Sequence, residues 1–167
     1  EAAKRMQQLI SQMLTLADVE RPDAALSMQQ LDLAAIATKA ALEMESIAYE
    51  KCVTLETALP EVCVLRGNPD YLQRIVSSLL ENALKYEPAG GRVQLTLTQD
   101  KRKARFSVQN FGSTIPEEDL PHVFDRFYRS DKSRKSESGS FGLGLAITKE
   151  MIEKLGGEIS VSSSAED

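Results

Sequence analysis

The sequence predicts a fold of the mixed α/β (α+β) class, in which amphipathic helices and short strands build one core. Two segments in the middle of the chain carry apolar residues at helical spacing, and five further segments have the pattern of strands. A length of 167 residues suits one domain with a small appended element. Hydrophobic residues make up 42% and charged residues 27%, which is typical of a soluble globular domain with a core of its own.

The first segment predicts an amphipathic helix. Its apolar residues stand at the a and d positions of a heptad pattern: Ala2, Met6, Leu9, Met13 and Leu16, with Ile10 and Leu14 widening the stripe. Fewer than three heptads favour a helix that seeks a partner helix over a long coiled coil. Pro22 in "ERPDAA" ends the pattern, so we expect a boundary between residues 1–21 and 22–167. Because the chain begins inside this pattern without an initiator Met, we expect a piece of a larger protein.

An extended segment and a second helix follow. "LSMQQLDL" leads to Asp32, a residue type that caps helix N-termini with its side-chain oxygen. The helix predicted after it carries one apolar face, formed by Leu33, Ile36, Ala40, Met44 and Ile47. Next come two alternating segments, "CVTLETAL" and "VCVLR", which predict strands.

The second half of the chain predicts two more helices and three more strands. "GNPD" starts a helix with Pro69 in its first turn, which continues through "YLQRIVSSLLENALKY". The strands "RVQLTLTQ" and "ARFSVQN" are joined by the charged turn "DKRK". Residues 113–141 are long, polar and without a period, which is typical of a functional or disordered loop. A helix to about Leu155 and a strand over 158–164 close the chain.

One stripe of the central helix has an unusual set of side chains. Ser78, Asn82, Lys85 and Tyr86 are spaced at i, i+4, i+7 and i+8 and therefore share one face. One interpretation is a solvated edge beside the core. The other is a nucleotide site, in which Asn82 gives an amide oxygen to a metal ion, Lys85 meets phosphate and Tyr86 covers an aromatic ligand. Magnesium prefers oxygen ligands shared with substrate phosphates, so this set suits a Mg-nucleotide.

Glycines mark two other places where a ligand could approach the backbone. Gly139, Gly142 and Gly144 stand just before the last helix, although glycine costs roughly 0.5–1 kcal/mol relative to alanine in regular structure. A helix N-terminus with free N–H groups binds phosphate well, and the alternative is a plain linker. Asn110 and Gly112 follow a strand and fit either a ligand contact or an ordinary turn.

The order of "ENALKY", "NFGSTI", "FDRFYRSD" and "GSFGLGL" resembles the N, G1, F and G2 boxes in the ATP-binding catalytic domain of bacterial sensor histidine kinases. The resemblance runs from about Ser27 to the end, and the first helix resembles the second helix of the kinase dimerisation hairpin. The wider superfamily includes gyrase B and the MutL ATPases, but "FDRFYRSD" indicates the kinase branch. We therefore expect a two-layer sandwich, with a mixed, largely antiparallel sheet and helices on one face, beside the N-terminal helix.

The resemblance also implies roles for individual residues. Around the metal and the base, Asn82 would bind Mg²⁺, Lys85 would contact phosphate, Tyr86 would line the pocket, Asn110 would bond the adenine amino group, and Gly112 and Ile115 would shape the adenine pocket. In the lid, about residues 125–141, Phe124 and Phe127 would act as anchors, Arg129 and Lys132 would approach the phosphates, Gly139, Gly142 and Gly144 would form the hinge and the phosphate cradle, and Leu143 and Leu145 would seat the helix.

Several positions depart from the family pattern. Ser78 replaces an Asn that the N box usually has, so a magnesium ligand would be lost or replaced by water. Asn110 replaces the Asp that begins the G1 box, and Thr114 replaces its second Gly. Phe141 stands where the G2 box has a small residue. The family fold also normally ends with one more strand than this chain provides.

The resemblance and the composition together define the expected function. The chain would bind Mg-ATP and pass the γ-phosphate to a histidine on a dimerisation domain that is not in this chain, so we assign no catalytic residue here. His122, the single histidine, is followed by Val123 and not by the acidic residue that follows the family's acceptor. Expected partners are that phosphoacceptor domain, a second copy through the missing hairpin, and the receiver domain of a response regulator.

Charge, hydropathy and cysteine content limit the partners and the location of the protein, and two alternative functions remain open. A net charge of −5 argues against nucleic acid as a partner, and no run of about 18 apolar residues exists to span a membrane. Cys52 and Cys63 fit no metal spacing and suit free thiols in a reducing compartment, with one disulfide between them as the alternative. We expect the cytoplasmic part of a membrane-anchored bacterial protein. Two alternatives remain, a gyrase- or MutL-type ATPase, which Ser78 disfavours because that branch has Glu there, and a degenerate interaction module without nucleotide.

Overall fold

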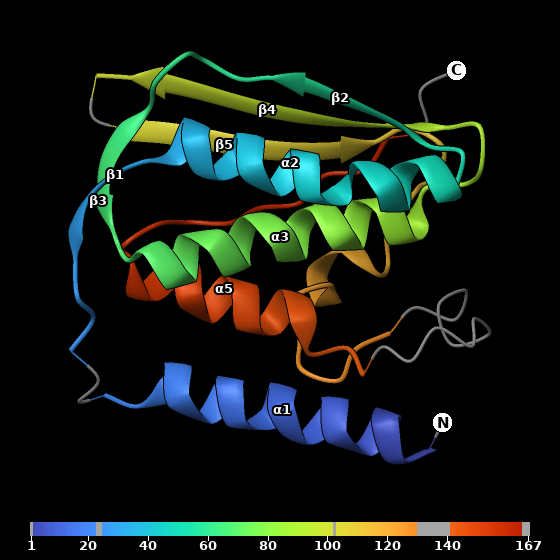
Figure 1. Ribbon diagram of the computed structural model, residues 1–167. Helices are drawn as coiled ribbons and strands as arrows, with labels where there is room; N and C mark the ends of the chain where they lie inside the picture. The colour runs from blue at the N-terminus through green and yellow to red at the C-terminus, as the bar shows by residue number, and fades with distance from the viewer. Residues whose placement is uncertain (1, 23–24, 102, 130–140, 165–167) are drawn as a thin grey trace. The chain divides into compact units, whose positions relative to one another are not determined.

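The computed structural model describes residues 2–22, 25–101, 103–129 and 141–164 (Figure 1). By its internal contacts the chain divides into two compact units. We call Leu26–Thr114 the sheet unit, and residues 1–25 with 115–167 the helical unit. None of the helices in the described ranges is long and apolar enough to cross a membrane.

The sheet unit has the two-layer arrangement that the sequence predicts. Its main sheet has the order β2-β4-β5, with β2 (Thr54–Ala58) parallel to β4 (Arg92–Asp100) and β4 antiparallel to β5 (Lys103–Asn110). Helices α2 (Leu33–Glu50) and α3 (Pro69–Tyr86) cover one face of this sheet (Figure 1). Two short strands, β1 (Gln29–Asp32) and β3 (Val64–Gly67), pair antiparallel in a separate small sheet. The predicted fold class is confirmed.

The core of the sheet unit lies between these two layers. Alternate residues of β4 point into it, so Val93, Leu95 and Leu97 are buried while the residues between them are more exposed. Leu80 and Leu84 of α3 pack in the same cluster, together with a row of small residues on α2 that lets the helices approach closely. The register of the β4–β5 hairpin, from Val93 opposite Asn110 to Asp100 opposite Lys103, places Asn110 beside the start of β4.

Local capping explains where the two helices of this unit begin. The Asp32 carboxylate accepts the Ala34 N–H at 3.0 Å and also the Cys63 N–H at 2.8 Å, which ties the start of α2 to the chain just before β3. Asn68 caps α3 by accepting the Tyr71 N–H at 3.0 Å, and its amide donates to the Ser27 carbonyl at 3.0 Å. Pro69 occupies the first turn, where no N–H is needed, as predicted.

The helical unit contains α1 (Ala2–Glu20), a short 3₁₀ turn η1 (Leu120–His122) and α5 (Gly144–Lys154). Leu16 and Val19 of α1 are buried, whereas Met6 and Leu14 of the same helix are each more than three-fifths exposed. The segment 158–164, which alternation predicts as a strand, is not a strand, so that prediction is wrong. A strand needs a ladder partner, and the contact described there is a single bond, from the Ile115 N–H to Ser163 Oγ at 2.9 Å.

Candidate functional site

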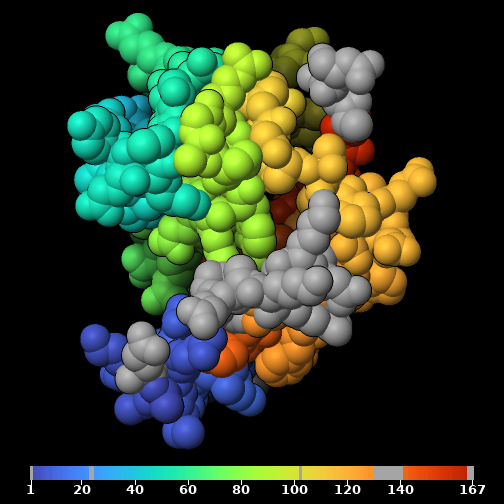
Figure 2. All heavy atoms as spheres, turned by 90° about the vertical axis from the view of Figure 1, so that its right-hand side faces the viewer, coloured from blue at the N-terminus to red at the C-terminus, as the bar shows by residue number. Residues whose placement is uncertain are grey.

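The polar stripe predicted on α3 lies along the edge of its buried face. Ser78, Asn82 and Lys85 are half-buried, and Tyr86 is 38% exposed at the end of the helix. The Lys85 ammonium lies 5.2 Å from the centre of the Tyr86 ring, within the range of a cation–π contact. Figure 2 shows the last turns of α3 at the molecular surface beside α2. The stripe therefore lies at the boundary between the buried face and the surface, and Lys85 and Tyr86 stand together at the C-terminal end of the helix.

A lysine from α2's end holds the last turn of α3. The Lys51 ammonium donates to the carbonyl of Leu84 and, at 3.1 Å, to that of Lys85. The final carbonyls of a helix carry a partial negative charge and have no partner within the helix, so a cation there is favourable. The side chains of Lys85 and Tyr86 thus stand on a turn that is held in place.

Glu87, directly after α3, joins this helix to the turn that follows β5. Its side chain is only 3% exposed, and its backbone N–H continues the helix to the Ala83 carbonyl at 3.0 Å. Its Oε1 accepts the Arg92 N–H at 3.0 Å and the Gly112 N–H at 2.9 Å, and Oε2 accepts the Gly112 N–H at 3.1 Å. The sequence interpretation missed Glu87, which has the pattern of a surface residue before "PAGG".

The turn at the end of β5 carries the two residues expected to meet adenine. The Asn110 side chain is half-buried, and its amide donates to Ser113 Oγ at 2.8 Å. Gly112 has a packing reason to be glycine, because a methyl group there would lie 2.5 Å from Pro88 Cγ and 2.7 Å from Glu87 Oε1. The start of β4 closes the turn, with the Arg92 guanidinium 4.0 Å from the centre of the Phe111 ring.

In the helical unit, the predicted lid anchor Phe127 is bound through its backbone. Its N–H donates to the Gly142 carbonyl at 2.9 Å, and both residues have positive φ, +62° at Phe127 and +72° at Gly142. A methyl group at Gly142 would lie 2.5 Å from the Tyr128 carbonyl oxygen, so this glycine is required both by conformation and by space. Phe127 as a whole is 58% exposed. This bond brings together the F and G2 box residues on the two sides of segment 130–140.

The remaining residues of the predicted site also belong to the helical unit. Ile115, Phe124 and Arg129 are half-buried, Leu143 is fully buried just before α5, and Gly144 and Leu145 form the first turn of that helix. Lys132 and Gly139 lie outside the described residues.

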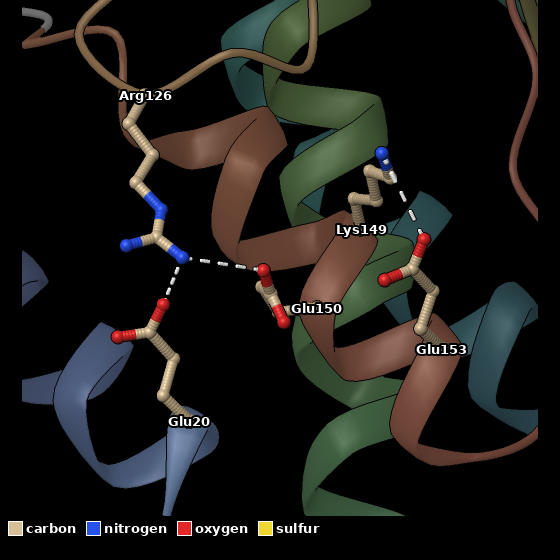
Figure 3. A network of polar contacts seen from close by, with 5 residues as sticks. All are labelled: Glu20, Arg126, Lys149, Glu150 and Glu153. Carbon is tan, nitrogen blue, oxygen red and sulfur yellow. Dashed lines mark hydrogen bonds and ion pairs between the residues drawn. The ribbon is translucent and has the colours of Figure 1, made fainter.

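An ion-pair network fixes the F box segment to two helices of its own unit (Figure 3). Arg126 contacts the carboxylates of Glu20 at the end of α1 and Glu150 of α5, the latter at 3.4 Å. On the other side of this segment, His122 Nδ1 lies 2.8 Å from Asp125, and the His122 ring lies 5.3 Å from that of Tyr128. His122 is thus engaged by a carboxylate and an aromatic ring, which fits a structural role.

The fold and these boxes define an ATPase class, and the comparisons with known proteins agree. The chain belongs to the family of histidine kinase-, DNA gyrase B-, and HSP90-like ATPases, whose sequence model matches residues 67–167. Over almost its whole length it is similar to sensor histidine kinases. It is 34% identical to sensor histidine kinase CusS of Escherichia coli O157:H7 over 99% of this chain and 34% of the relative. Identity to RppB of Synechocystis sp. is also 34%, over 96% of this chain and 36% of the relative.

Solved structures show the same likeness. The mycobacterial sensor histidine kinase MprB is 28% identical, with a TM-score of 0.65, over 78% of this chain and 81% of the other. Full-length ShkA in complex with AMPPNP is 25% identical, with a TM-score of 0.79, over 93% of this chain and 32% of the other. The Acinetobacter baumannii histidine kinase AdeS, at 22% identity and a TM-score of 0.77, shares the fold over 96% of this chain and 73% of the other. The chain spans about a third of the length of the two curated relatives named above.

Proposed function

We propose that this chain binds Mg-ATP and presents its γ-phosphate to a histidine on a helical hairpin of the same kinase. The observation that carries this proposal is the bond between α3 and the turn after β5. Through Glu87, the helix that bears Asn82, Lys85 and Tyr86 is joined to the turn that bears Asn110 and Gly112. Residues from two separate sequence boxes are thereby held at one end of the sheet unit. Membership of the ATPase family supports the same interpretation.

The residues present suit a magnesium nucleotide. Asn82 offers an amide oxygen on a half-buried face, and magnesium is commonly held by one or two protein oxygens together with substrate phosphates. Lys85 brings positive charge to the same end of the helix, and the exposed Tyr86 ring offers an apolar surface to a base. ATP would supply the phosphoryl group, and the protein would contribute positioning and charge stabilisation. The similar protein ShkA forms a complex with AMPPNP, which supports an adenine nucleotide here.

The helical unit would complete this function. We propose that residues 125–141 act as the nucleotide lid, with Arg129 and Lys132 approaching the phosphates. Phe127 and Gly142 would hold its two ends, since their backbones are hydrogen-bonded. The backbone around Gly139 and Gly144 would receive phosphate at the start of α5. Residues 1–21 would belong to the dimerisation hairpin, and residues 22–167 to the catalytic domain.

The proposed partners follow from the kinase relatives. They are the phosphoacceptor domain of the same kinase, a second copy through the hairpin, and the receiver domain of a response regulator. The whole protein would be membrane-anchored, with this part in the cytoplasm.

The test of nucleotide binding is a calorimetric titration of the chain with ATP, with and without Mg²⁺. Wild-type protein should bind ATP in a magnesium-dependent way, and Asn82→Ala should lose that dependence while keeping its melting temperature, because the side chain lies beside the core and not within it. Glu81→Ala is the matched control, since Glu81 is exposed on the neighbouring face of α3. Absence of binding by folded wild-type protein would favour a degenerate module. Normal Mg-ATP binding by Asn82→Ala would remove Asn82 from the metal site.

A further inference from the structure

Glu87 is a buried carboxylate in a place where a surface residue would be expected. It ends α3 with an extended backbone, φ −75° and ψ 127°, so its side chain turns away from the helix axis toward β4 and β5. A charged group is rarely this buried unless it is paired or fully hydrogen-bonded. Here two backbone N–H groups, of Arg92 and Gly112, satisfy it through three short contacts.

The chain makes room for this carboxylate with two glycines. A methyl group built at Gly91 would overlap the Glu87 carboxylate, and the three nearest heavy atoms to it all belong to the Glu87 side chain. A methyl group at Gly112 would lie 2.7 Å from Glu87 Oε1. Real Cβ atoms do not approach other atoms so closely, so both positions admit only glycine while the carboxylate is in place. Glu87, its near neighbour Gly91 and the more distant Gly112 therefore form one local structure.

The hydrogen bonds of Glu87 determine where the turn after β5 lies. Gly112 is bound by both carboxylate oxygens, and the neighbouring Phe111 N–H donates to the Arg92 carbonyl at 3.3 Å. Asn110 stands two residues earlier, and its amide is bound to Ser113 within the same turn. A hydrogen bond to an ionised acceptor is roughly twice as strong as a neutral one, so a carboxylate holds this turn better than an amide would.

We propose that Glu87 is the positioning residue that sets adenine selectivity, by fixing the turn of Asn110 and Gly112 against the end of α3. This inference rests on the proposed nucleotide function. Glu87 does not need to touch the nucleotide, because it acts through the backbone of Gly112. Loss of the carboxylate would let the turn move relative to Lys85 and Tyr86. Contacts that distinguish one base from another would then suffer more than contacts to phosphate.

The experiment compares Glu87→Gln with the wild-type chain in calorimetric titrations with Mg-ATP and Mg-GTP. Glutamine has one acceptor oxygen and places an NH₂ group against an N–H donor, so it cannot reproduce both bonds to Gly112. We expect the Kd for ATP to rise about five- to tenfold, which corresponds to about 1 kcal/mol, and the ATP-to-GTP preference to fall severalfold. Glu56→Gln is the matched control. Glu56 lines the same surface hollow as Glu87 but accepts none of the three contacts, so both values should stay within twofold of wild type.

A second measurement separates positioning from general loss of structure. The amide resonance of Gly112 in a ¹⁵N–¹H spectrum should move strongly in Glu87→Gln, while resonances of β1 and β3 stay in place. If Glu87→Gln does not fold, Glu87→Asp takes its place. It keeps the charge, but its shorter side chain cannot reach both N–H groups, so selectivity should fall here too.

The outcomes distinguish the role of Glu87 from the proposed function itself. If wild-type protein binds no ATP, the proposed function fails. If wild-type protein binds ATP and a folded Glu87 variant keeps both the affinity and the ATP-to-GTP preference, only the role of Glu87 is overturned. An equal loss in Glu56→Gln would also overturn it, because the effect would then come from charge and not from the bonds to Gly112.

Discussion

At the residue scale, the proposed adenine contact is made by Asn110, a neutral amide in the position where the G1 box usually has an aspartate. A hydrogen bond to a neutral acceptor makes a net contribution of about 0.5–1.5 kcal/mol, and one to a charged acceptor about 1.5–3 kcal/mol. In the structure the Asn110 amide donates to Ser113 Oγ, and the serine hydroxyl can rotate to donate to a carboxylate instead. Asn110→Asp should therefore keep its local bond and tighten ATP binding about five- to tenfold, measured by calorimetry. A severalfold weaker affinity would remove Asn110 from the adenine contact.

The buried thiol of Cys63 should make the free energy of unfolding fall at alkaline pH. Burial raises the pKa of its thiol above the ordinary value of 9.0, and the nearby negative charge of Asp32 raises it further. Above pH 9 the unfolded chain releases this proton while the folded chain keeps it, so the unfolded state binds fewer protons and stability falls as pH rises. Urea unfolding at pH 7.5 and pH 10 should show a larger loss of free energy for wild type than for Cys63→Ala. Equal losses in the two proteins would show that other groups cause the fall in unfolding free energy between the two pH values.

At the scale of the element, α3 depends on a cap supplied by another helix. Lys51 donates to two carbonyls at the end of α3, and a cation at a helix C-terminus contributes about 0.3–1 kcal/mol, up to about 2 kcal/mol when partly buried. Lys51→Met should lower the free energy of unfolding by about 1 kcal/mol in urea titrations. Lys39→Met is the control, because the Lys39–Glu43 pair is exposed and 3.8 Å apart, and its loss should cost less than about 0.5 kcal/mol. Equal losses of unfolding free energy in the two variants would mean that the cap stabilises the protein no more than an exposed ion pair does.

The helices could be predicted from the sequence, but the ends of several elements could not. Alternation predicts a strand from Cys52, whereas the structure begins β2 at Thr54, because Cys52 has a φ of +54° and the Val53 N–H returns to the Ala48 carbonyl as part of the turn after α2. The strand predicted over 158–164 fails for a related reason, since alternation reports which side chains face a core and not whether a ladder partner exists. Glu87 could not be predicted because its partners are backbone groups that only the fold brings near. The closest sequence signal was the pair Gly91 and Gly112.

At the scale of the whole molecule, we expect ATP binding without self-phosphorylation. Phosphoryl transfer needs a nucleophile about 3–3.5 Å from the phosphorus and in line with the leaving group. His122 is the single histidine, and it is already paired with Asp125 and set against the Tyr128 ring. Incubation with γ-labelled ATP should leave this chain unlabelled. Adding a segment of the parent protein that carries the acceptor histidine should produce label on that segment. Acid-labile, base-stable label on this chain alone, lost in His122→Ala, would falsify the assignment of the acceptor to another segment.

The space shared by Glu87 and Gly91 has a consequence for how this sequence can evolve. While position 87 carries a long side chain, any residue larger than glycine at 91 meets the carboxylate, so Gly91→Ala alone should be strongly destabilising. In a Glu87→Ala background the three obstructing atoms are gone, and the same change should cost little. The two substitutions are thus epistatic, with a coupling free energy of about 0.5–3 kcal/mol in a double-mutant cycle of urea unfolding. Additive effects would contradict this. Of the two mutational orders that lead to the double variant, only the one that changes position 87 first avoids the overlap at position 91, so the history of Gly91 depends on that of Glu87.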